Sequence, residues 1–104
     1  MKKLPSSAKV VVIGGGVVGC SCAYHLAKFG WKDVVLVERD KLTSGTTWHA
    51  AGLVSQIGPS APITKIRKYS LDLYKELEKK VDHSAGLRLN GAMSIAQEEG
   101  RWRE

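Results

Sequence analysis

Residues 9–19 read KVVVIGGGVVG, and this stretch decides the fold. The run Lys9 to Ile13 is rich in β-branched residues and is followed directly by three glycines. This pattern suits a parallel strand buried on both faces. From Val17 to Phe29 apolar residues recur at helical spacing. The apolar run Val34 to Val37 then predicts a second strand. Residues 9–38 therefore form one β-α-β unit of an α/β fold.

The glycines Gly14, Gly16 and Gly19 have the G-x-G-x-x-G spacing of a dinucleotide-binding turn between a strand and a helix. Gly14 permits the tight turn. Gly16 lets the backbone approach a pyrophosphate, since a Cβ there would collide with it. Gly19 lacks bulk, so the helix can lie close on the sheet. The first N–H groups of the helix can then receive the phosphate charge.

An acidic residue, Glu38, ends the second strand about twenty residues after the glycines, the usual distance in this motif. Its carboxylate can accept hydrogen bonds from ribose hydroxyls. The same charge would repel a 2′-phosphate, which argues against NADP. The glycine motif and this acid together leave both FAD and NAD open.

Residues 40–60 are rich in Gly, Ser and Thr and have no sustained period, which is typical of a functional loop. Trp48 and His49 within it could flank a flat aromatic ring, and a packed loop with an ordinary histidine is the open alternative. Residues 63–82 predict an amphipathic helix. Residues 87–96 predict a short β-hairpin around an Asn-Gly turn.

Composition argues for one small domain without a nucleic-acid or membrane partner. The chain has 104 residues, 43% of them hydrophobic and 25% charged, with a net charge of +6. The basic residues are scattered among acids rather than gathered in a patch. No run approaches the ~20 apolar residues of a membrane span. No leader peptide is recognisable, so we expect a cytoplasmic protein, or a mitochondrial-matrix protein if the source is eukaryotic.

The cysteines and histidines do not predict a metal site. Cys20 and Cys22 lie two residues apart on the expected first helix and point to different faces. His25, His49 and His83 have no ligand-like spacing. We therefore expect no metal and no disulfide.

The run SGTTWHAAGL, residues 44–53, closely resembles the dimethylglycine and sarcosine dehydrogenase family, flavoproteins of the D-amino-acid-oxidase-like group. The resemblance extends to residues 10–16, 23–28, 32–36 and 73–77. It implies FAD as the cofactor. It also implies that the chain is the N-terminal fragment of a larger flavoprotein, with a Rossmann-like FAD-binding unit, a cofactor-wrapping loop, a following helix and a hairpin.

The resemblance implies roles for individual residues as well. Val17 and Val18 would contact FAD, and Glu38 and Arg39 would hold the adenosine ribose region. The histidine that matches His49 bonds covalently to the 8α-methyl carbon of the flavin in that family. The cofactor-wrapping stretch comprises Gly45, Thr46, Thr47, Trp48, His49, Ala50, Ala51, Gly52 and Leu53.

The resemblance further implies an amine-oxidising enzyme. Family members oxidise the C–N bond of a small N-methyl amino acid by hydride transfer to flavin, and several carry a C-terminal domain that binds tetrahydrofolate. Ser94 stands where an arginine is frequent, which leaves the subfamily and therefore the substrate open. The sequence also leaves the electron acceptor open. We expect the 104-residue chain alone to be inactive, because parallel strands need neighbours and cover on both faces.

Three other functions remain open. A regulatory, non-catalytic flavoprotein resembling the pyruvate dehydrogenase phosphatase regulatory subunit would share this architecture, but Trp48 and His49 favour an enzyme. Another amine oxidase of the D-amino-acid-oxidase-like group is the second. An NAD-dependent dehydrogenase is the third, and the long loop of residues 40–60 argues against it.

Overall fold

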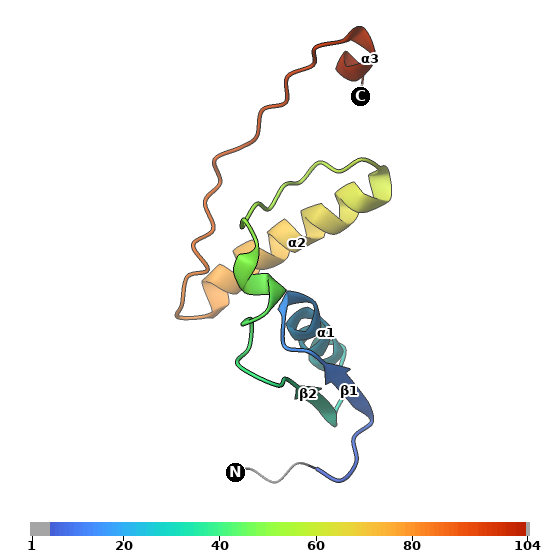
Figure 1. The fold of residues 1–104 in the computed structure, drawn as a ribbon, viewed down its shortest axis with the longest axis vertical. Helices are drawn as coiled ribbons and strands as arrows, with labels where there is room; N and C mark the ends of the chain where they lie inside the picture. The colour runs from blue at the N-terminus through green and yellow to red at the C-terminus, as the bar shows by residue number, and fades with distance from the viewer. Residues whose placement is uncertain (1–4, 104) are drawn as a thin grey trace. The chain divides into compact units, whose positions relative to one another are not determined.

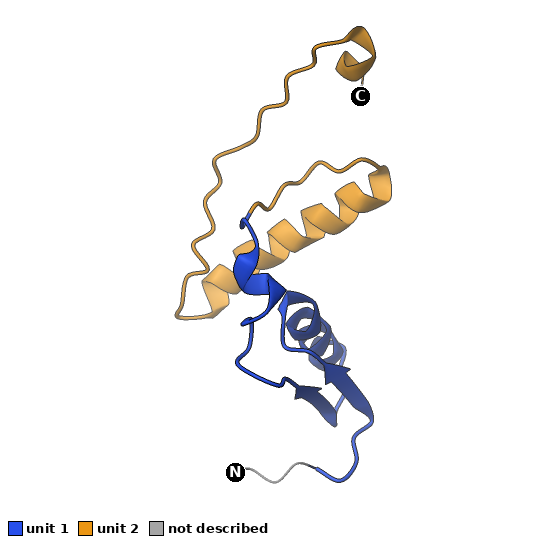
Figure 2. Cartoon of the chain, viewed as in Figure 1, with its two compact units in different colours: residues 1–52 blue, residues 53–104 orange. Residues whose placement is uncertain are grey.

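A computed structural model describes residues 5–103 and divides the chain into two compact units, residues 1–52 and 53–104 (Figure 2). The first unit begins with strand β1 (Val10–Ile13), helix α1 (Val17–Lys28) and strand β2 (Val34–Val37). A 3-10 turn, η1 (Thr46–His49), lies in the segment that follows β2. The chain is therefore of the α/β class expected from its sequence.

The two strands of the first unit are parallel, with Val10 opposite Val34 and Ile13 opposite Val37. Helix α1 connects them and packs against both (Figure 1). Because the carboxyl ends of parallel strands meet at one edge of a sheet, the glycine turn after β1 and Glu38 after β2 lie close together. The fold itself thus assembles the candidate site.

The expectation that β1 is buried on both faces is wrong for this chain. Val11 is 53% exposed and Ile13 is 86% exposed, whereas Val10 and Val12 are half-buried. Successive side chains of a strand point to opposite faces. One face of β1 therefore packs under α1, and the face that carries Val11 and Ile13 is open in the described part of this unit.

The second unit contains α2 (Ala61–Lys80) and a short helix, α3 (Glu99–Trp102), which the sequence did not predict. Helix α2 begins and ends two residues earlier than the expected 63–82, and a proline stands in its first turn, where it is tolerated because its missing N–H has no partner there. Leu71 is its buried side chain. Within residues 5–103, no helix is both long enough and apolar enough to span a membrane.

The expected hairpin at residues 87–96 is not formed. Gly91 has the positive φ of a turn, 76°, but no strand is present on either side of it. The apolar side chains Leu89, Met93 and Ile95 are exposed. A lone two-stranded hairpin is marginal in water without a third strand or a helix to cover it. Turn chemistry alone therefore does not make the strands pair here.

Candidate cofactor-binding site

The glycine turn after β1 is tight and closely packed on one side. Gly14 has φ 102°, and its N–H donates to the Val37 carbonyl at 2.8 Å. A Cβ on Gly19 would lie 1.8 Å from the carbonyl oxygen of Gly14, so only glycine lets α1 approach this closely. A Cβ on Gly14 would meet nothing within 4 Å. The turn is thus packed against α1 and open where a ligand would approach.

Glu38 is held against the glycine turn by two backbone N–H groups. Its Oε2 accepts from Gly15 at 2.6 Å and its Oε1 from Asp40 at 3.1 Å. The Gly15 bond first, and the Asp40 bond second, keep the pKa of this carboxyl below its ordinary value of 4.5. Each carboxylate oxygen retains capacity for a further donor. Glu38 can therefore accept hydroxyl donors while it stays fixed.

The segment after β2 folds back onto the start of α1. The Val17 N–H donates to Thr47 Oγ1 at 2.9 Å, and the Thr43 N–H donates to the Gly15 carbonyl at 2.9 Å. Gly15 is buried between Glu38 and Leu42, whose Cδ2 would lie 2.5 Å from a Cβ at this position. The sequence motif assigned no role to Gly15, Leu42 or Thr43. The run of three consecutive glycines was the one feature of the sequence that could have pointed to a role for Gly15.

His49 lies at the end of η1 with a defined tautomer. Its Nδ1 is 3.0 Å from the carbonyl oxygen of Gly45. A carbonyl only accepts, so Nδ1 must carry the proton, and the neutral ring presents an unprotonated Nε2. The neighbouring Trp48 is 79% exposed. Both rings are thus available to a ligand.

These features fit the pyrophosphate and adenosine ribose of a flavin dinucleotide well. The open turn at Gly14 and the N-terminus of α1 suit a pyrophosphate. Glu38 suits a ribose at the adjoining strand end. Val18 and Arg39 are exposed beside these positions. Leu53, the last residue of the expected cofactor-wrapping stretch, belongs to the second unit.

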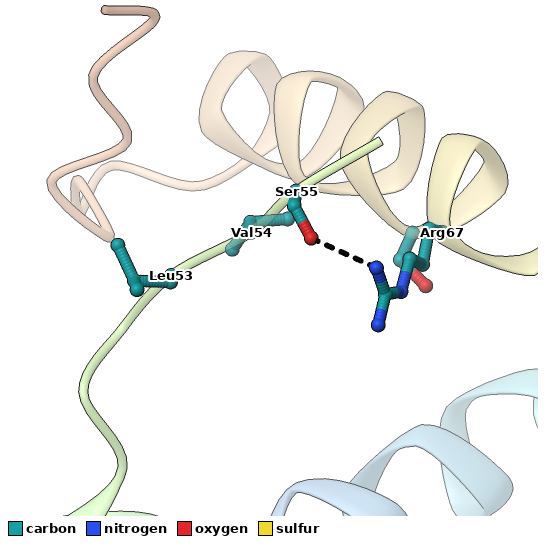
Figure 3. Close-up of a pocket in the computed structure, with 5 residues that line it drawn as sticks. Leu53, Val54, Ser55 and Arg67 are labelled. Atoms are coloured by element: carbon teal, nitrogen blue, oxygen red, sulfur yellow. Dashed lines mark hydrogen bonds between the residues drawn. The ribbon is translucent and has the colours of Figure 1, made fainter. Parts of the chain in front are cut away.

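A shallow hollow of about 170 Å³ lies in the second unit, and Leu53 is one of the residues that line it (Figure 3). Leu53, Val54, Ser55, Arg67 and Ser70 line it. The Arg67 guanidinium donates to Ser55 Oγ at 3.2 Å and to the Ile57 carbonyl at 2.5 Å. Arg67 therefore anchors the segment before α2 to that helix, a role that the sequence did not reveal because the partners are distant along the chain.

Comparison with known proteins identifies the class to which this fold and site belong. Residues 9–104 match the family described as FAD dependent oxidoreductase, and the chain belongs to that family. The chain is 48% identical to human mitochondrial dimethylglycine dehydrogenase over 89 residues, 86% of this chain. It is 46% identical to human mitochondrial sarcosine dehydrogenase over 101 residues, 96% of this chain.

A third relative has a different name. The chain is 42% identical to the mouse mitochondrial pyruvate dehydrogenase phosphatase regulatory subunit over 98 residues, 94% of this chain. The chain spans 10% to 11% of the length of these three relatives. The resemblance to dimethylglycine and sarcosine dehydrogenases read from residues 44–53 is thus confirmed at the level of the family.

Glu38→Gln should make stability depend less on pH. The carboxylate of Glu38 has a lowered pKa in the folded chain, so its contribution is fully present above the unfolded value of 4.5 and is lost as pH falls through the folded value. Glutamine cannot accept at both positions, because its NH₂ faces one donor. We expect the midpoints of thermal unfolding of the full-length protein and this variant to differ at neutral pH and to converge in acid.

The matched control is Glu98→Gln, at an exposed carboxyl that makes no hydrogen bond or ion pair within residues 5–103. This control should track the wild type at every pH. A difference for Glu38→Gln that stays constant from neutral pH to acid would show that the two N–H bonds do not stabilise the ionised form.

Proposed function

We propose that this chain is the FAD-binding part of an enzyme that oxidises the C–N bond of a small N-methyl amino acid. The observation that carries the proposal is the joining of two features in one unit: a dinucleotide turn with its acid, Glu38, and the His49 turn docked on the same helix start. Relatives titled dimethylglycine dehydrogenase and sarcosine dehydrogenase support the substrate class.

The chain's residues divide between the two ends of FAD. The backbone of residues 14–19 and the N-terminus of α1 bind the pyrophosphate, with Val17 and Val18 alongside. Glu38 and Arg39 hold the adenosine ribose. Residues 45–53 wrap the rest of the cofactor, which supplies a two-electron acceptor for the substrate hydride. Loss of the hydride would leave a substrate iminium. Water would add to its carbon and release formaldehyde and the demethylated amine, or tetrahydrofolate would take up that carbon.

His49 bonds covalently to the flavin through Nε2 in this proposal. The Gly45 carbonyl holds the proton on Nδ1, so the lone pair that can attack lies on Nε2. Forming this bond would replace one methyl C–H of the flavin and one imidazole N–H with a C–N bond. Dioxygen would take up the two protons and two electrons and become hydrogen peroxide, which balances the reaction.

A regulatory flavoprotein without turnover is the second candidate, favoured by the 42% identity to a phosphatase regulatory subunit. It predicts FAD binding at the same turn and no chemistry. The relatives named as mitochondrial favour a mitochondrial location if the source is eukaryotic.

Anaerobic reduction of the bound flavin separates the two candidates. Dimethylglycine or sarcosine added to the oxidised full-length protein should bleach the visible flavin band at about 1 per second or faster. Betaine, whose nitrogen has no lone pair to assist hydride loss, should leave the band unchanged. A flavin-loaded protein that no N-methyl amino acid bleaches would refute the enzyme and favour the regulatory candidate.

A further inference from the structure

The start of α1 is capped by a residue thirty positions further along the chain. Gly16 at the N-cap provides no side chain, and the first turn contains no acidic residue. Helix starts leave N–H groups without intrahelical partners, and a hydroxyl normally satisfies one of them. Here Thr47 does so, since its Oγ1 accepts from the Val17 N–H at 2.9 Å.

Thr47 and His49 belong to one closed turn. The Trp48 N–H and His49 Nδ1 both donate to the Gly45 carbonyl, at 3.1 Å and 3.0 Å. The Ala50 N–H donates to the Thr47 carbonyl at 3.3 Å. A group that fixes Thr47 therefore also fixes the imidazole two residues later.

Gly16 leaves the room that this contact needs. A Cβ at Gly16 would lie 3.0 Å from Thr47 Oγ1, tighter than ordinary van der Waals contact. Because Gly16 has no side chain, it leaves room for the Thr47 hydroxyl as well as for the expected pyrophosphate. Thr43, four residues before Thr47, makes no hydrogen bond with its side chain within residues 5–103.

We propose that Thr47 is a positioning residue for the attachment of flavin. Its hydroxyl, seated on the Val17 N–H, fixes the His49 turn against the start of α1, so that one FAD molecule meets its pyrophosphate site and His49 in the correct register. This role rests on the proposed function, because it requires FAD to be held at both places. Thr47 acts through the turn and need not touch the flavin.

The first test follows covalent incorporation of FAD into full-length apoprotein. Thr47→Val keeps the side-chain shape and removes the hydroxyl, and it should slow incorporation about tenfold, because small misplacements of reacting groups are costly. Thr47→Ser restores the hydroxyl and should stay within about twofold of wild type, as should the control Thr43→Val, which lies outside the cofactor-wrapping stretch. Affinity for ADP should change by less than about threefold, since Glu38 and the glycine turn remain.

The second readout needs no cofactor. Amide hydrogen exchange at Val17 and residues 45–50 of the apoprotein should be about fivefold faster in Thr47→Val and unchanged in Thr43→Val. Unchanged exchange in Thr47→Val, or equal losses in the two variants, overturns the role of Thr47. A wild type that holds FAD without a covalent bond refutes the His49 bond and, with it, the attachment role of Thr47. Faster exchange in Thr47→Val would then show only that the hydroxyl fixes the turn.

Discussion

Replacing Gly19 with alanine is expected to abolish FAD binding by forcing α1 away from the glycine turn. The new Cβ would lie 1.8 Å from the carbonyl oxygen of Gly14 and 3.0 Å from its carbonyl carbon. Both atoms are backbone, so no side chain can move aside. We expect a loss of at least about 3 kcal/mol in the free energy of unfolding, at the upper end for overpacking. Thermal unfolding and the flavin content of the full-length protein measure both effects.

Gly100→Ala is the matched control, because a Cβ there meets nothing within 4 Å and its backbone φ is not positive. It should change stability by about 0.5 kcal/mol or less. A Gly19→Ala protein with wild-type stability and flavin content would show that close contact between the glycine turn and α1 is not required.

The β-α-β unit could be predicted from the sequence because its signals are local. Strand and helix periods, the spacing of Gly14, Gly16 and Gly19, and the position of Glu38 all lie within 30 consecutive residues. The structure departs from that prediction where burial depends on other elements. Ile13 is open because a second covering layer is absent from the described part of its unit.

Sequence patterns could not predict the contacts between residues that are distant along the chain. The Thr47 cap and the Arg67 anchor join residues 30 and 10–12 positions apart, and no periodicity marks such pairs. The prediction of a hairpin at residues 87–96 was wrong for a related reason. Its Asn-Gly turn is a strong local signal, but strands also need a neighbour to cover them.

Replacing His49 with alanine should leave none of the flavin covalently attached in the full-length protein. The glycine turn and Glu38 do not contact the imidazole, so FAD should still bind and should wash into the supernatant after acid precipitation. His83→Ala is the control, since this exposed histidine lies in the second unit, and its flavin should stay in the pellet. Flavin retained in the His49→Ala pellet would place the bond elsewhere.

Peptide mapping of the wild-type protein tests the central claim, that the His49 turn holds the flavin. Trypsin cuts after Lys41 and Lys65, and residues 42–65 contain His49 as their sole histidine, with no cysteine or tyrosine. We predict that this peptide carries the mass of FAD and that fragmentation places it on His49. Unmodified residues 42–65 from a flavin-saturated protein, or FAD on another peptide, would contradict the account.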